Sequence, residues 1–302
     1  MKLNNKILNE MLKQAKKTAL KNDCVNDSNF SVSAALLTKS GKIYTGHNIE
    51  NFGIQATCSE RTTFTKALSE GEKEFIAILV IAYPKAEKKF TSAWPCGYCR
   101  EFMSSFLGSE FLIYTIDDNE NFLEEKLGNL VPLKDFSKKT NYQLDENIKL
   151  RNDILVGKNI EELKKQYNQN ELKVLLEEAK KAAQNTNFYF QKEGAALITH
   201  NEQGETKLYT GATQTDNNGS IIRAPKVALL KALTEGFNKF DKILILKYEN
   251  EIIEELWMSY DVIQLFLQYT SLDFKILTID NELNIKETTI REVLPYPFEF
   301  EK

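Results

Sequence analysis

The sequence has few of the features that mark membrane, disulfide-bonded or nucleic-acid-binding proteins. None of its 302 residues falls in an apolar run of eighteen or more, so no segment is predicted to cross a membrane as a helix. Four cysteines are too few for a disulfide framework and fit a reducing compartment better. The formal net charge of -4 argues against a broad surface for binding phosphate backbones. Because the first residues also lack an apolar stretch followed by a cleavage site, we expect a cytoplasmic protein that acts on no nucleic acid.

Three of the four cysteines lie in two short segments whose spacing indicates a zinc site. Cys58 is followed two residues later by Glu60, and Cys96 and Cys99 form a P-C-x-x-C segment further along the chain. Three thiolates can bind zinc and leave its fourth position for water, as in hydrolytic sites, whereas structural zinc sites are closed by four ligands. Glu60 is then the acid–base group of the site.

Each of these segments is predicted to begin a helix, one at Cys58 and one at Cys96. Backbone N–H groups without a partner, together with the positive end of the helix dipole, favour thiolates at a helix start. Two such helix starts that meet at one metal ion would lower the pKa values of the thiols and promote metal binding.

Two other interpretations of the cysteines have to be weighed. Cys96 and Cys99 could form a redox pair with Cys58 as an unrelated core residue, but this leaves Glu60 unexplained. A closed structural zinc site would need Cys24 or one of the two histidines as a fourth ligand, and none of these has a recognisable ligand spacing.

The order of predicted elements indicates a three-layer α/β/α domain. An apolar stripe predicts a first helix, and alternating and continuous apolar runs predict strands, the run Phe75–Ala82 being apolar enough for a strand buried on both faces. The predicted elements are a helix over 7–19, a hairpin over 30–38 and 42–46, a helix over 58–71, a strand over 75–82, a helix from 96 to about 107 and a strand over 110–116.

Polar residues follow the hairpin directly before the first cysteine. Asn48 and Glu50 are two apart in an extended segment, so they point to the same side and could hold the hydroxyls of a ribose. The alternative is that they merely close a strand. His47 points to the other face and is interpreted as structural.

Four motifs, in order along the chain, resemble those of the cytidine deaminases: FSVSAA, GHNIEN, CSER and PCGYCR. The resemblance implies zinc bound by three cysteines and proton transfer by Glu60 between water and the cytosine ring, with release of ammonia. The residues that it assigns to zinc are Cys58, Cys96 and Cys99, those to the ribose are Asn48 and Glu50, and Phe30 packs near the base.

The chain departs from the family pattern at several positions of the expected site. Ser59 replaces the usual Ala, and Trp94 stands where Ser or Thr commonly precedes Pro95. Both positions contact the pyrimidine through backbone groups in the family, so Ser59 and Trp94 are candidate substrate-binding residues. Three thiolates give zinc a net negative charge, which weakens its effect on water, and Arg61 and Arg100 are candidates to offset it.

The second half of the sequence repeats the pattern of the first half but lacks its cysteines and its acidic residue. Apolar and glycine positions recur, but at an offset of 165 Arg223 stands at the position of Cys58 and Pro225 at that of Glu60. At an offset of 163, Ser259 and Val262 replace Cys96 and Cys99. We therefore expect a tandem duplication of the fold with a catalytic domain over 1–136, a linker over 137–170 and a degenerate domain over 171–302.

The sequence thus predicts zinc-dependent hydrolysis of cytidine, deoxycytidine or both in pyrimidine salvage. The resemblance extends to a bacterial type in which a catalytic domain and a degenerate copy dimerise, so a homodimer is expected. A dCMP or blasticidin-type deaminase is the nearer alternative, a tRNA or single-strand DNA deaminase would need a basic channel, and a zinc-binding pseudoenzyme would follow if Trp94 closes the pocket.

Elemental analysis of the purified protein should find about one zinc per chain, because Arg223, Ser259 and Val262 cannot replace three thiolates. Cys58→Ser should lose most of this zinc, whereas Cys24→Ser should keep it. Two zinc ions per wild-type chain would contradict the degenerate-copy interpretation.

Overall fold

The computed structural model describes residues 3–25, 28–50, 56–131, 136, 139–142, 149–151, 156–187, 191–215, 221–256 and 258–294. These residues form two compact units, one within Met1–Ile154 and the other within Leu155–Thr215 and Ile221–Lys302. In the part of the chain that is described, every helix is too short or too polar to cross a membrane.

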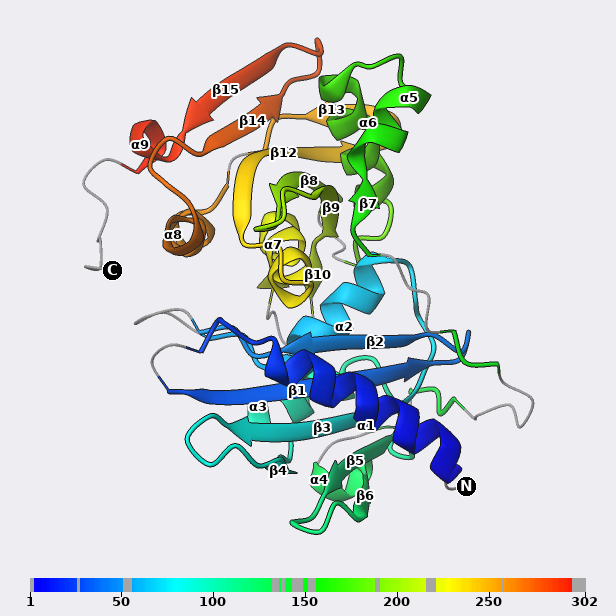
Figure 1. Cartoon of the computed structure of the whole chain (residues 1–302). Coiled ribbons are helices and arrows are strands. Elements are labelled where there is room, and N and C mark those ends of the chain that lie inside the picture. Colours follow the sequence, from blue (N-terminus) through cyan, green and yellow to red (C-terminus); the bar gives the residue numbers. More distant parts are fainter. Residues whose placement is uncertain are drawn as a thin grey trace. The chain divides into compact units, whose positions relative to one another are not determined.

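The first unit is built on a mixed sheet whose strand order is β2-β1-β3-β5-β6, with β4 paired to β3 (Figure 1). β1 and β2 form the predicted antiparallel hairpin, and β3 pairs antiparallel with β1 and parallel with β5. The elements are α1 (Asn5–Leu20), β1 (Phe30–Thr38), β2 (Ile43–His47), α2 (Ser59–Ser69), β3 (Phe75–Pro84), β4 (Thr91–Ser92), α3 (Gly97–Ser104), β5 (Leu112–Ile116), β6 (Phe122–Lys126) and α4 (Leu127–Leu130).

Helices cover both faces of this sheet, which confirms the three-layer prediction. The apolar stripe of α1 packs in one core cluster with alternate residues of β1 such as Ala35 and Leu37. On the opposite face the Phe64 ring of α2 lies 5.1 Å from that of Phe75 and 6.3 Å from that of Phe102 on α3. The two helices that carry the cysteines therefore share one apolar contact. α3 ends at Ser104, a few residues before the predicted end.

The second unit has a sheet of order β15-β14-β12-β8-β9-β7, with β13 paired to β12, and a separate two-stranded sheet, β10-β11. Its elements are β7 (Lys158–Asn159), α5 (Ile160–Gln166), α6 (Glu171–Ala183), β8 (Glu193–His200), β9 (Thr206–Ala212), β10 (Gln214–Thr215), β11 (Ile221–Ile222), α7 (Ala224–Thr234), β12 (Lys239–Glu249), β13 (Ile252–Glu254), α8 (Tyr260–Tyr269), β14 (Lys275–Ile279), β15 (Ile285–Thr289) and α9 (Ile290–Val293).

Strand register confirms that the second unit repeats the fold of the first. In the first sheet, Ala34 pairs with Gly46 on one side and with Val80 on the other. In the second sheet, Ala195 pairs in the same way with Gly211 and with Ile245.

A buried lysine in each unit makes the same contact. Lys66 Nζ donates to the carbonyl oxygen of Thr45 at 3.2 Å, and Lys231 Nζ donates to that of Thr210 at 2.5 Å. Both lysine positions and both threonine positions differ by 165, so the two copies share side-chain contacts as well as backbone.

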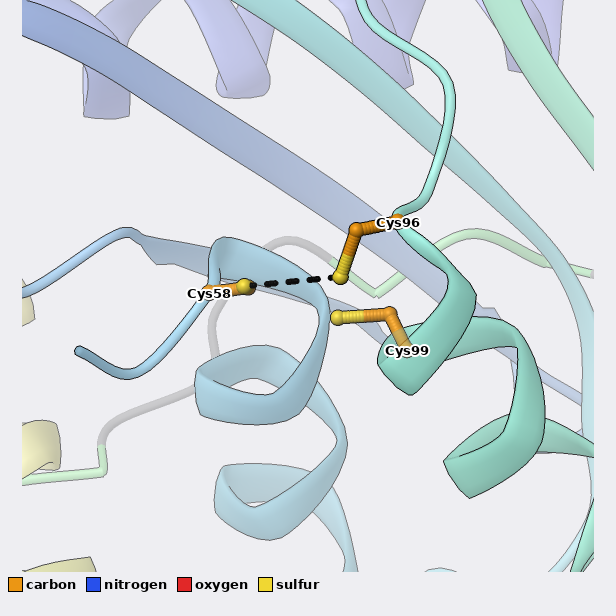
Figure 2. Close-up of side chains that lie close together, drawn as sticks. All are labelled: Cys58, Cys96 and Cys99. Carbon is orange, nitrogen blue, oxygen red and sulfur yellow. Dashed lines mark hydrogen bonds between the residues drawn. The ribbon is translucent and has the colours of Figure 1, made fainter. Parts of the chain in front are cut away.

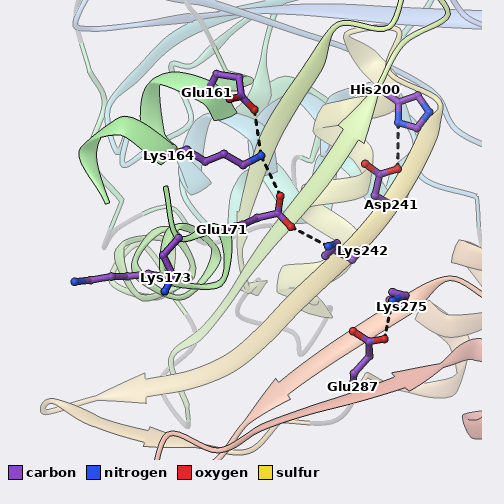
Figure 3. A network of polar contacts seen from close by, with 10 residues as sticks. Glu161, Lys164, Glu171, Lys173, His200, Asp241, Lys242, Lys275 and Glu287 are labelled. Atoms are coloured by element: carbon purple, nitrogen blue, oxygen red, sulfur yellow. Dashed lines mark hydrogen bonds and ion pairs between the residues drawn. The ribbon is translucent and has the colours of Figure 1, made fainter. Parts of the chain in front are cut away.

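Part of the stretch expected as a linker is built into the second unit. Strand β7 pairs antiparallel with β9, and Lys164 of α5 contacts Glu161 at 3.1 Å and Glu171 of α6 at 3.2 Å. Glu171 also pairs with Lys242 of β12 at 2.8 Å, so the ion pairs join α5, α6 and the sheet (Figure 3). Residues from Lys158 onward are thus attached to the second unit by strand pairing and ion pairs. The polar composition of the stretch did not indicate these contacts.

Candidate metal centre and catalytic residues

The three predicted ligands come together where two helices begin. Cys58 is the N-cap residue of α2, Cys96 is the N-cap residue of α3, and Cys99 lies in the first turn of α3. Their Sγ atoms all lie within 4.8 Å of one another, and those of Cys58 and Cys96 are 3.9 Å apart. Figure 2 shows the three side chains pointing toward one another from the two helix starts.

This arrangement fits a tetrahedral zinc ion with one position left over. Zinc–sulfur bonds of about 2.3 Å at tetrahedral angles put the sulfurs about 3.8 Å apart. The 3.9 Å pair already has this spacing, and a separation of up to 4.8 Å needs only a small contraction. Among the described residues no His, Asp or Glu joins the group, so this group offers three ligand atoms to a metal ion.

Hydrogen bonds within the cluster favour a thiolate at Cys96. The thiols of Cys58 and Cys99 donate to Cys96, and the backbone N–H groups of Cys99 and Tyr98 add to them, which lowers the pKa of Cys96. The same sharing of protons raises the pKa values of Cys58 and Cys99. A bound cation would remove this competition, because it stabilises all three thiolates together.

Glu60 lies in the first turn of α2, buried beside the thiols. Its side chain is only 3% exposed, and the Ser59 hydroxyl donates a hydrogen bond of 2.9 Å to its Oε2 atom. Burial raises the pKa of Glu60 above its usual range, while the hydrogen bonds from the backbone and from Ser59 oppose the shift. A carboxyl group whose pKa is raised holds a proton more readily than an exposed one, which suits a group that must both accept and return a proton.

Arg61 brings the positive charge that the sequence predicted next to the thiols. Its Nη2 atom lies 3.9 Å from Cys58 Sγ and donates to the carbonyl oxygen of Ala56 at 2.9 Å, and its guanidinium lies 4.3 Å from the ring centre of Tyr98. Burial lowers the pKa of Arg61, but the nearby Cys99 and Cys58 raise it by more, so the group stays charged.

The sequence of the first unit is similar to that of known proteins. The family model "Cytidine and deoxycytidylate deaminase zinc-binding region" matches residues 5–115. A probable cytidine deaminase of Dictyostelium discoideum is 39% identical over 106 residues, which cover 35% of this chain and 68% of the relative. The chain belongs to the cytidine deaminase family.

Two further relatives indicate how wide the family is. A cytidine deaminase of Sporosarcina psychrophila is 37% identical over 106 residues, 35% of this chain and 74% of its own length. A blasticidin-S deaminase of Bacillus cereus is 30% identical over 112 residues, 36% of this chain and 79% of its own length.

Arg100, the second cation that the sequence proposed for this site, contacts backbone carbonyl groups. Its Nε atom donates to Pro95 at 2.7 Å and its Nη1 atom to Leu130 at 3.3 Å. In this cytidine deaminase family member, Arg100 therefore fixes the turn that leads into α3, while Arg61 approaches a thiol.

The residues expected to meet the sugar and the base lie around the first strand. Asn48 Oδ1 accepts hydrogen bonds from the Val32 backbone at 2.8 Å and its Nδ2 atom donates to the carbonyl oxygen of Phe30 at 2.9 Å. Glu50 Oε2 accepts from the Ser28 backbone N–H at 3.3 Å, so both side chains reach the segment that leads into β1, and their contact with a ribose stays a prediction. Phe30 is 43% exposed and thus available for contact.

The remaining predicted residues differ in exposure. The Trp94 side chain is 36% exposed, so it does not fill the core. His47 is buried, one ring nitrogen lies 3.0 Å from the Asn48 carbonyl oxygen, and it is not part of the cysteine group, in agreement with a structural role.

Two residues of the site were missed in the sequence. Tyr98 was quoted as part of the cysteine motif, but only the fold brings its ring against Arg61. Asn22 donates to Asn48 Oδ1 at 2.8 Å from a polar loop in which nothing distinguishes it. Its burial, 1% exposed, is a tertiary property without a local signal.

The second unit keeps the helix starts and replaces the ligands. Arg223 is the N-cap residue of α7 and Ser259 that of α8, at the places of Cys58 and Cys96. Pro225 lies in the first turn of α7 where the first unit has Glu60. The sequence comparison of the two copies therefore holds in three dimensions.

We expect Arg61→Ala to lower the rate of deamination and to move the acid limb of the pH–rate profile upward. Removal of a cation 3.9 Å from a thiol makes the cluster more negative, so the ionisation needed for activity occurs at higher pH, by on the order of one unit. Lys39→Ala is the control, since it removes an exposed cation of the same unit that pairs with Glu74 at 3.1 Å. The same pH profile for Arg61→Ala and wild type would contradict the proposed charge compensation.

Proposed function

We propose that this protein is a zinc-dependent hydrolase that deaminates cytidine, deoxycytidine or both, giving the uracil nucleoside and ammonia. The observation that carries the proposal is the group of three thiols with a buried carboxyl group beside it and, in the described part of the chain, no fourth His, Cys, Asp or Glu in the group. This is the set of groups that the reaction needs: a site for a metal and its water, and a separate proton carrier.

The proposed reaction assigns separate tasks to the side chains of the site. Zinc, held by Cys58, Cys96 and Cys99, supplies a water of lowered pKa when it is bound. Glu60 takes a proton from water and returns protons to N3 and to the amino group at C4 of the cytosine ring, so the group that leaves is ammonia. The Ser59 hydroxyl holds the Glu60 carboxyl in place.

Nucleoside recognition is proposed for residues around the start of β1. Asn48 and Glu50 contact the segment that carries the exposed ring of Phe30, so the three residues are close enough to meet a ribose and a base. The backbone at Ser59 and Trp94 would contact the pyrimidine. Blasticidin-S is the second candidate substrate, because a relative named for its deamination is 30% identical. Parallel assays with cytidine, deoxycytidine, dCMP and blasticidin S distinguish these candidates, and no turnover of any would indicate a pseudoenzyme.

Domain roles follow from the distribution of the chemistry. We propose a catalytic domain over 1–136 and a non-catalytic domain over 171–302, with a place in pyrimidine salvage. Of the expected linker over 137–170, the part from Lys158 onward packs with the non-catalytic domain. Cysteines that must stay reduced to bind zinc suit the cytoplasm.

We further propose a homodimer in which the degenerate domain serves assembly. Light scattering should then give a mass near twice 34.7 kDa for the full chain. A fully active monomer at assay concentration would contradict this proposal without affecting the zinc chemistry.

Glu60→Gln should keep the fold and about the wild-type zinc content but lose at least the roughly hundredfold rate factor typical of general acid–base catalysis. The amide has nearly the same size and cannot carry the proton. Loss of cytidine absorbance measures the rate, and Glu70→Gln, at the other end of the same helix, is the control. A zinc-replete Glu60→Gln enzyme with wild-type turnover would rule out the assigned role.

A further inference from the structure

The second unit contains a cavity at the place where the first unit has its thiols. The cavity has a volume of about 180 Å³, and a cavity of about 150 Å³ is already large enough for a benzene-sized molecule. It is lined by Gln191, Glu193, Arg223, Pro225, Lys247, Leu256, Met258, Ser259 and Val262.

Charged residues have replaced the metal-binding chemistry around this cavity. Arg223 and Ser259 stand at the helix-start positions of Cys58 and Cys96. Glu193 of β8 and Lys247 of β12 are direct cross-strand partners, so their side chains point to the same face of the sheet. The corresponding pair in the first unit, Val32 and Ala82, is uncharged.

Glu193 fixes the arginine at the wall of the cavity. The Glu193 side chain is fully buried, and its two oxygens are both engaged, one by Arg223 Nη1 and the other by the Thr213 hydroxyl. Thr213 Oγ1 in turn accepts a hydrogen bond of 2.9 Å from the backbone of Ala224, the first residue of α7. Arg223 is thereby held in one orientation, and four of its five N–H donors are left over from this ion pair.

The remaining polar groups of the wall are mostly donors. Lys247 is 31% exposed, and its nearest described carboxylate, that of Glu254, is 3.7 Å away and 65% exposed. The Ser259 hydroxyl is buried and has no hydrogen-bond partner among the described residues, so it lacks a contact that such a group normally makes. The wall of the cavity thus holds two cations, an unsatisfied hydroxyl and one carboxylate, Glu193, whose oxygens are already occupied. The second carboxylate, Glu254, lies outside the lining and is mostly exposed.

We propose that this cavity binds a small organic oxyanion, a carboxylate or a phosphate monoester with a short apolar group. Arg223 and Lys247 bind the anionic head, and Ser259 donates its hydroxyl to it. Leu256, Met258 and Val262 form the apolar side against the rest of the ligand. The site is separate from the proposed deaminase chemistry and requires none of the cysteines.

Methyl NMR of the full zinc-loaded chain, labelled with ¹³C-methyl methionine, tests this proposal. Met258 lines the cavity, while Met11 and Met103 are buried in the first unit and serve as internal references. Benzoate and phenyl phosphate are the two anionic probes, benzamide is the neutral analogue, and all samples are matched in ionic strength with chloride. We expect a saturable shift of the Met258 signal with at least one anion, and binding at least about tenfold weaker for benzamide, because hydrogen bonds to charged groups contribute that much. The tighter probe identifies the anion class.

Variants locate the binding site. Lys247→Gln should weaken anion binding about tenfold, since it removes one cation and leaves the buried Glu193–Arg223 pair intact. Lys239→Gln, on the same strand β12 and exposed, is the matched control and should bind as wild type. Arg223→Lys keeps a positive charge next to Glu193 but removes the forked N–H donors of the guanidinium group, so it should weaken anion binding as well.

Three results would overturn the proposal: no saturable Met258 shift with either anion, equal binding of benzamide, or unchanged affinity in both Lys247→Gln and Arg223→Lys. None of them bears on cytidine turnover, which depends on the first unit, so the two proposals can fail independently.

Discussion

The candidate metal centre depends on two helices of the first unit whose N-terminal ends lie next to each other. α2 and α3 follow different strands, yet their N-cap residues, Cys58 and Cys96, have sulfurs 3.9 Å apart. The contact of Phe64 with Phe102 links the two helices through apolar packing, while the parallel pairing of β3 with β5 fixes the crossover that contains α3. A shift of either helix by one turn, about 5.4 Å, would separate the thiols beyond the reach of one metal ion.

The negative charge of three thiolates has to be compensated in such a cluster. Three thiolates in a partly buried place repel one another, and hydrogen bonds alone stabilise chiefly the thiolate of Cys96. Arg61 lies within 3.9 Å of Cys58 and is held by the Ala56 carbonyl group and the ring of Tyr98. The guanidinium is therefore a fixed part of the site, and its orientation does not rely on the thiolates that it stabilises.

The second unit shows that the same backbone fold can carry different polar side chains at the helix starts. The strand register and the buried lysine contact are the same in both copies, but in the second unit Arg223, paired with Glu193, stands at the position of Cys58. Glu193 is fully buried, so removal of Arg223 would leave its charge without the partner that compensates it.

The sequence by itself determined the parts that depend on local pattern. Apolar periodicity gave the first helix and the hairpin, and the spacing of Cys58, Glu60, Cys96 and Cys99 indicated a hydrolytic zinc site. The repeat at offsets of 165 and 163 was likewise visible, because the apolar positions of both copies follow the same periods.

Only the tertiary structure decided what the polar side chains contact. In the folded chain the ring of Tyr98 lies against Arg61, and Arg100 donates hydrogen bonds to the carbonyl groups of Pro95 and Leu130. The hydroxyl of Ser59 donates a hydrogen bond to Glu60. The tertiary structure also paired β7, in the predicted linker, with β9. A long polar side chain can bond to many different groups, and the sequence does not show which of them will be near it. Packing between segments that are far apart in the chain decides which contact forms.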